Sequence, residues 1–136
     1  MNSSLQKRFA PIPVEVEEIG KKVLDAAYAV HSALGPGLLE SVYEACLAHK
    51  LRQQNVQVAT QVAMPVTFEG IQIETGLRLD LLVGKLVSVE LKSVDRLIPL
   101  HEAQLLTYLK VTGLRLGFLI NFNVFHLKDG LKRMVN

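Results

Sequence analysis

The spacing of apolar residues changes partway along the chain, and this change restricts the chain to folds that combine helices with a sheet. Apolar residues first recur at helical spacing in two segments, 14–34 and 39–51, separated by the sequence GPG at 35–37. Residues 56–68 and 71–83 then alternate between apolar and polar, as strands do. The pattern predicts two amphipathic helices followed by a sheet.

The predicted second helix carries an apolar stripe that we expect to be buried. The stripe consists of Leu39, Val42, Tyr43, Cys46, Leu47 and Leu51. Two pairs of turn residues, Glu69-Gly70 and Gly84-Lys85, then separate three successive strand patterns. We therefore predict a three-strand antiparallel meander.

The last third of the chain predicts one more helix and one more strand. Pro99 precedes a helical segment that ends at Gly113, and RLGFLINF at 115–122 is a short apolar strand. The segment 126–136 is expected to be a polar tail. Hairpins give antiparallel neighbours and a strand-helix-strand unit gives a parallel pair, so an α/β domain with a mixed sheet is expected.

Length and composition indicate one globular domain. The chain has 136 residues and a net charge of +2, and residues 1–13 read as a flexible lead-in to a single domain at 14–136. The mild positive charge is compatible with nucleic acid without arguing for it. The one cysteine, Cys46, excludes an internal disulfide and a cysteine-based zinc cluster and favours a cytoplasmic setting; we expect it to be a small core residue.

No targeting or membrane segment is expected. The first residues contain no apolar core of a signal peptide, and no stretch approaches the roughly 18 apolar residues of a membrane span.

Polar side chains interrupt the strand at 84–93, which is otherwise apolar enough to be central in a sheet. Alternation places Glu90 and Lys92 on the face opposite Val89 and its apolar neighbours. Asp80 interrupts the preceding strand in the same way, and pairing of the two strands brings it close to Glu90. Glu40 stands on the second helix, one turn before Tyr43.

Convergent carboxylates of this kind predict a metal site. A pair about 4 Å apart repels by roughly 4 kcal/mol at an effective dielectric near 20, and a bound hard dication removes that penalty. Mg²⁺ prefers carboxylate oxygens and water, and it would activate a water or polarise a phosphoryl oxygen. Lys92 would orient the water or stabilise the anionic transition state. Taken singly, Asp80 is more often a bulge or surface residue, and Glu90 and Lys92 a cross-strand ion pair.

Other polar residues allow two interpretations. Gln104 and Tyr108 are four apart on the third helix and so share a face, where they would contact a phosphate or the backbone at a helix end. His31 is better explained as a half-buried histidine with its hydrogen bonds satisfied. His101 and Lys110, like the terminal basic residues, would touch a nucleic-acid backbone or simply be solvated.

Several segments resemble one protein family in the same order along the chain. Gly37, Glu40 and Tyr43 have the spacing that names the GxxExxY family. Other similar segments are VHSALGPG, LRLDLLV, VSVELKS, HEAQLLTYLKVTGLRLGFLINFN and LKDGLKRMV. The resemblance covers nearly the whole chain from about residue 15.

The GxxExxY family is placed in the PD-(D/E)XK nuclease superfamily, and the resemblance implies a fold and a site. The expected fold is a three-layer α/β/α restriction-endonuclease-like core in the order αβββαβ with a mixed central sheet. The resemblance makes Asp80, Glu90 and Lys92 the D…(E)xK triad and Glu40 the helix acid completing the metal site. Gln104 and Tyr108 match the Q-x-x-x-Y motif of RecB-type nucleases, whereas Leu79 replaces the proline of the superfamily's name.

These features favour a Mg²⁺-dependent nuclease, with Mn²⁺ able to substitute and DNA as the expected substrate in repair, recombination or defence. Asp80 and Glu90 would bind metal with help from the Leu91 carbonyl, Glu40 would bind it directly or through water, and Gln104 and Tyr108 would hold the phosphate or the site's geometry. Specificity would come from DNA ends or structure, a homodimer or a partner protein. The alternative is a catalytically weak or inactive nuclease-fold module that binds nucleic acid or a protein.

Overall fold

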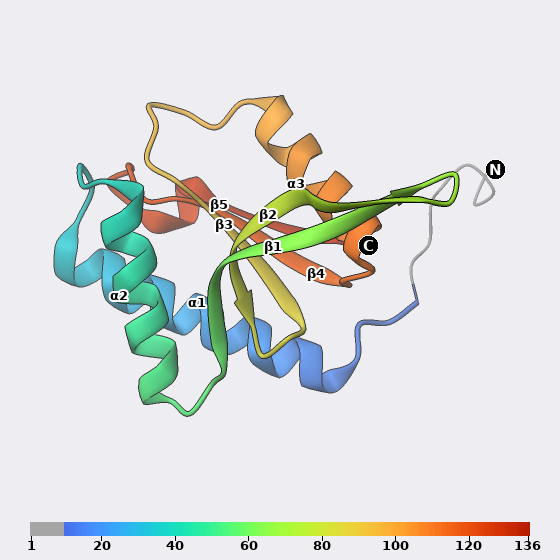
Figure 1. Ribbon diagram of the computed structural model, residues 1–136. Helices are drawn as coiled ribbons and strands as arrows, with labels where there is room; N and C mark the ends of the chain where they lie inside the picture. Colours follow the sequence, from blue (N-terminus) through green and yellow to red (C-terminus); the bar gives the residue numbers. More distant parts are fainter. Residues whose placement is uncertain (1–9) are drawn as a thin grey trace, which may run out of the picture.

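The computed structural model describes residues 10–136 and contains three α-helices, one 3₁₀ helix and five strands there (Figure 1). In chain order these are α1 (Val14–Leu34), α2 (Glu40–Gln53), β1 (Val58–Phe68), β2 (Ile71–Val83), β3 (Val87–Lys92), α3 (Pro99–Thr112), β4 (Leu116–Asn121), η2 (Leu127–Gly130) and β5 (Leu131–Val135). None of the helices in this part of the chain combines the length and apolarity needed to cross a membrane.

The five strands form one mixed sheet in the order β1-β2-β3-β4-β5. The pair β3–β4 is parallel and the other three pairs are antiparallel, which confirms the predicted meander and strand-helix-strand unit. Both predicted hairpin turns are present: Glu69 and Gly70 have φ of 48° and 82°, and Gly84 and Lys85 have 58° and 61°. Two consecutive positive φ angles match the right-handed twist of the strands that such a turn joins.

Helices cover both faces of the sheet, which gives the expected three-layer arrangement (Figure 1). The α1 and α2 helices bury their apolar sides against Val87, Val89 and Leu91 of β3 in a large core. On the other face a smaller core joins α3 to β4 through three fully buried residues, Leu105, Leu109 and Leu119.

The outer part of the β1–β2 hairpin extends beyond the rest of the sheet (Figure 1). The β3 strand pairs only with Leu81–Val83 of β2, so the residues nearer the tip pair only across the hairpin. The side chains of Phe68 and Ile71 at the tip are 65% and 64% exposed.

Two predictions for the ends of elements were wrong. The segment 126–136 is not a polar tail, because η2 leads into β5 and β5 pairs with β4. Leu39 and Val42 do not belong to the buried stripe of α2, since Leu39 lies before the first turn and is 74% exposed and Val42 is 37% exposed. Cys46 is half-buried and packs against the large core as expected.

The predicted lead-in lies mostly outside the described residues, which begin at Ala10. In the part that is described, Ile12 packs against the large core. The carbonyl of Ala10 accepts a 2.7 Å hydrogen bond from Arg115.

Candidate metal and nuclease site

The candidate site lies where β2 and β3 stop pairing. The regular pairing of the two strands reaches Leu81 and Val89 and stops before Asp80 and Glu90. Beyond this point hydrogen bonds from backbone to side chain join the two strands. The Asp80 N–H donates to Glu90 Oε2 at 3.0 Å, and the Leu91 N–H donates to Asp80 Oδ2 at 2.9 Å. Each carboxylate is therefore held by the backbone of the other strand.

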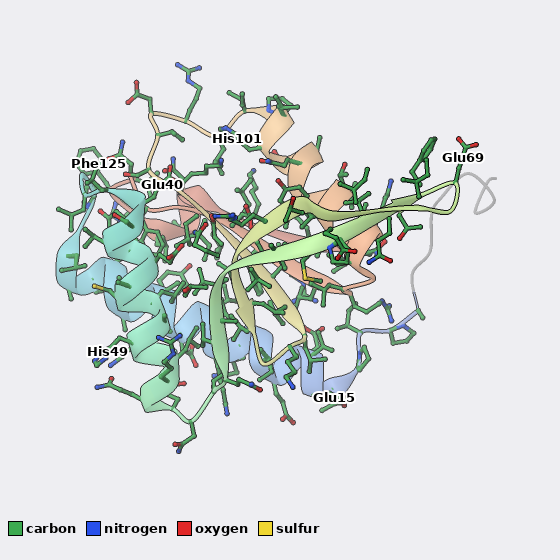
Figure 2. The ribbon with its side chains drawn as sticks, in the orientation of Figure 1. Glu15, Glu40, His49, Glu69, His101 and Phe125 are labelled. Atoms are coloured by element: carbon green, nitrogen blue, oxygen red, sulfur yellow. The ribbon has the colours of Figure 1, made fainter. Side chains whose placement is uncertain are left out.

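Glu40 joins this pair from the first turn of α2. Its Oε2 accepts a 3.2 Å hydrogen bond from the N–H of Ser93, directly after the end of β3. The Ser93 hydroxyl donates to the carbonyl of Leu38 at 2.6 Å, so this serine links the end of β3 to the loop that leads into α2. Figure 2 shows Glu40 at the upper end of that helix.

The three residues of the GxxExxY spacing have separate structural roles. Gly37 has a φ of 99°, which favours glycine in the loop before α2. Tyr43 is fully buried, and its hydroxyl donates to the Gly35 carbonyl at 2.6 Å and accepts from the Leu38 N–H at 3.1 Å. Tyr43 therefore fixes the loop from which Glu40 enters the site.

Burial and neighbouring charges change the acidity of Glu90. Its side chain is 6% exposed, and burial, with a further contribution from the Asp80 carboxylate, raises the pKa of Glu90 from an ordinary 4.5 to about 8. The Asp80 N–H and the Lys92 ammonium act in the opposite direction, and Glu40 raises the pKa further. The structure thus brings four residues chosen from the sequence within electrostatic range of one another.

Lys92 is not held in an ordinary ion pair. The side-chain ion pairs within residues 10–136 are Lys21–Asp25 and Arg133–Glu17, neither of which involves the site. The described chain therefore shows no ion pair of either Glu90 or Lys92 that would give these two residues a purely structural role.

An open pocket of about 370 Å³ lies against these acids, and we call it the acidic pocket. It is lined by Glu40, Ser41, Glu44, Gln61, Asp80 and Leu91. Three of these residues, Ser41, Glu44 and Gln61, were not anticipated. Gln61 donates to Glu44 Oε1 at 2.6 Å and to Asp80 Oδ1 at 3.4 Å. Glu44 could have been found from the sequence, because it follows Glu40 by four residues and therefore lies on the same face of the helix. Gln61 could not, because its positive φ of 51° has no signature in the sequence.

Gln104 and Tyr108 do not line the acidic pocket. The Gln104 amide donates to the Tyr108 hydroxyl at 2.9 Å on α3. Within residues 10–136 no hydrogen bond joins them to the acids or to Lys92. His101 also has a local structural contact, since its Nδ1 accepts from the Ile98 N–H at the start of α3.

The residues fit a hard cation in their chemistry. Asp80, Glu90, Glu40 and the Leu91 carbonyl offer only oxygen, which Mg²⁺ prefers. Within residues 10–136 no three His, Cys, Asp or Glu side chains are arranged to hold a metal ion between them. The reason is visible at Asp80 and Glu90, whose carboxylates are turned onto backbone N–H groups.

Comparison with known proteins gives one family match. Residues 17–134 match the PD-(D/E)XK nuclease superfamily. Neither the curated proteins nor the solved structures gave a match. Because the matched segment covers nearly all of the chain, the protein belongs to the PD-(D/E)XK nuclease superfamily.

Proposed function

We propose that the protein is a Mg²⁺-dependent nuclease that hydrolyses phosphodiester bonds in DNA, and that it belongs to the GxxExxY group of its superfamily. The observation that carries the proposal is the reciprocal placement of Asp80 and Glu90 on adjacent strands, with Glu40 and Lys92 in electrostatic range. A purely structural site gains nothing from placing two further carboxylates, Asp80 and Glu40, around the buried acid Glu90, because the three groups repel each other.

Asp80, Glu90 and the Leu91 carbonyl would hold the metal, with Glu40 completing the set directly or through water. When bound, the metal would stabilise negative charge on a phosphoryl oxygen and lower the pKa of a bound water molecule. Metal binding would compete with the two N–H···O contacts of these carboxylates, and at pH values below about 8 it would require the Glu90 carboxyl to lose its proton.

Lys92 has the role of positioning the attacking water and balancing the developing negative charge. It lies two residues after Glu90 on the same face of β3, and no acid in the described chain neutralises it by an ion pair. Gln104 and Tyr108 support the phosphate or the site's geometry from α3 when substrate is bound. Mn²⁺ is expected to replace Mg²⁺, since it accepts the same oxygen ligands. The single cysteine favours a cytoplasmic location, and a homodimer or partner protein would add specificity.

Two measurements test the function. Calorimetric titration of Mg²⁺ into wild type, Asp80→Ala and Glu90→Ala reports metal binding, and cleavage of linear, nicked and single-stranded DNA reports activity. We expect wild type to bind and cleave, and both variants to lose the two properties together. A folded wild type that binds no metal and cleaves nothing contradicts the proposal and favours the nuclease fold as a binding module.

Glu74→Ala is the matched control, because Glu74 is an exposed acid on the projecting hairpin, hydrogen-bonded only to Gln72 in the described chain. It should leave both metal binding and cleavage unchanged.

A further inference from the structure

A second pocket lies beside the loop that carries Glu40, and its chemistry differs from that of the acids. This aromatic pocket has a volume of about 490 Å³, within the range of small-ligand sites. Its lining includes Tyr28, His31, Ser32, Phe125, His126 and Lys128. The described residues that line it include no Asp or Glu. The pocket therefore suits a ligand that is anionic and has an aromatic face.

Phe125 is the most informative residue of the aromatic pocket. Its side chain is 90% exposed, so it contributes little to the core of its own chain. Figure 2 shows it at the outer edge of the molecule, at the same end as Glu40. An uncovered aromatic ring beside a cationic side chain offers a stacking surface for a nucleic-acid base, with Lys128 and His126 available to the phosphate.

The two loops that form the aromatic pocket are rigidly attached to the scaffold. His31 Nε2 lies 2.8 Å from the Val124 carbonyl, and since a carbonyl only accepts, this nitrogen carries the proton. Tyr43 stacks on Phe122 with ring centroids 4.4 Å apart and also holds Gly35 through its hydroxyl. The same aromatic residues thus set the positions of the 122–126 loop and of the loop leading to Glu40.

One smaller pocket adjoins the aromatic pocket and another adjoins the acidic pocket. Pro36 and Phe125 line both the aromatic pocket and a neighbouring one of about 230 Å³. Another pocket, of about 340 Å³, begins at Leu38 and shares Glu40 with the acidic pocket. Pro36 and Glu40 are four positions apart along the chain, so their Cα atoms are at most about 14 Å apart. One short loop therefore contributes residues to both pockets.

We propose that the aromatic pocket binds an unpaired nucleotide of the same strand whose phosphate lies at the acids. The inference rests on the proposed nuclease function and narrows its substrate to DNA with a single-stranded end, flap or gap. A base inside a duplex is stacked and paired, and its face is not available to Phe125.

The test measures binding in the absence of divalent metal, so it does not depend on cleavage. Fluorescence anisotropy compares a labelled single-stranded oligonucleotide with a blunt duplex of the same sequence. We expect Phe125→Ala to weaken single-strand binding by about 5- to 150-fold, the loss of one stacked base, and to leave duplex binding nearly unchanged. Phe68→Ala is the matched control, because Phe68 is also exposed and lies on the distant hairpin. It should change neither affinity.

Two further measurements test whether the ligand is a nucleotide within a strand. Lys128→Gln should lower the slope of log affinity against log salt by about 0.7 for the single strand, the value of one phosphate contact. Deoxyadenosine monophosphate should compete only at much higher concentration than the oligonucleotide. Competition at equal concentration would make a free nucleotide the occupant and overturn the proposal.

The results separate the two proposals. If the protein cleaves DNA and Phe125→Ala binds single-stranded DNA as tightly as wild type, the proposal for the aromatic pocket is wrong and the nuclease proposal stands. If single-stranded DNA binds through Phe125 but is not cleaved in Mg²⁺, the proposal for the aromatic pocket is supported and the nuclease proposal is contradicted. A wild type that binds no single-stranded DNA overturns the pocket whether or not it cleaves duplex.

Discussion

The buried acid Glu90 should make the protein less stable as pH rises, and replacing it with glutamine should remove this effect. The pKa of Glu90 is raised to about 8, so between pH about 4.5 and pH about 8 the folded chain keeps a proton that the unfolded chain has released. Because the folded state binds more protons in this window, the free energy of unfolding falls as pH rises through it. Below the window both states are protonated and the effect is absent.

The size of the effect follows from the width of that window. One proton contributes at most about 1.4 kcal/mol for each pH unit, so the interval from 4.5 to about 8 corresponds to an upper limit of roughly 5 kcal/mol. Glu90→Gln carries no titrating proton, and its amide oxygen still accepts from the Asp80 N–H. The variant should therefore match wild type near pH 5 and exceed its free energy of unfolding by roughly 3–5 kcal/mol near pH 8.

Urea unfolding of both proteins in metal-free buffer across this pH range measures the difference directly. Asp80→Asn is an informative second variant, because removing the neighbouring charge lowers the pKa of folded Glu90, so that the decline in stability ends at a lower pH and is smaller than in wild type. Parallel curves for wild type and Glu90→Gln would refute the reasoning, since they would mean that Glu90 is ionised in the folded chain as readily as in the unfolded one.

Two further predictions concern the metal and the segment after β3. Binding of one Mg²⁺ at pH 7 should release close to one proton from Glu90, and the release should vanish near pH 9. Calorimetry measures the release as a dependence of the binding heat on the ionisation enthalpy of the buffer. No proton release at pH 7 would mean that Glu90 is not a ligand. Asn121→Ala should cost roughly 1–3 kcal/mol in urea unfolding and reduce cleavage, because the buried Asn121 side chain bonds both the N–H and the carbonyl of Val94 close to Lys92. Asn123→Ala, which loses only a 3.3 Å contact to the same carbonyl, should cost less, and equal losses would contradict the assigned role of Asn121.

The sequence predicted those parts of the fold that depend on local patterns. Helical spacing located α1 and α2, Pro99 and Gly113 marked the ends of α3, and alternation with Gly-containing turns located the meander. The convergence of Asp80 and Glu90 followed from the same turn, because the distance of each residue from Gly84-Lys85 sets the pairing of the two strands.

The parts that were missed depend on contacts between distant segments. The β5 strand has only five residues, and it forms because it pairs with β4 while Arg133 reaches Glu17 on α1 with two hydrogen bonds of 2.9 and 3.0 Å. The aromatic pocket combines α1 with the loop after β4, and nothing in either segment alone indicates it. Leu39 and Val42 repeat at helical spacing, but helical spacing does not show whether a neighbour covers that side of the helix.

The unequal size of the two cores determines the order in which the molecule opens. Few buried apolar contacts attach α3 to the sheet, so amide hydrogens of α3 should exchange with solvent through a local opening that leaves α1, α2 and the sheet folded. In that partly opened state Asp80 and Glu90 remain joined across β2 and β3, while the buried Leu119 of β4 becomes hydrated. The α3 helix is thus a detachable cover for β4, and the two strands that carry the acids stay paired when it opens.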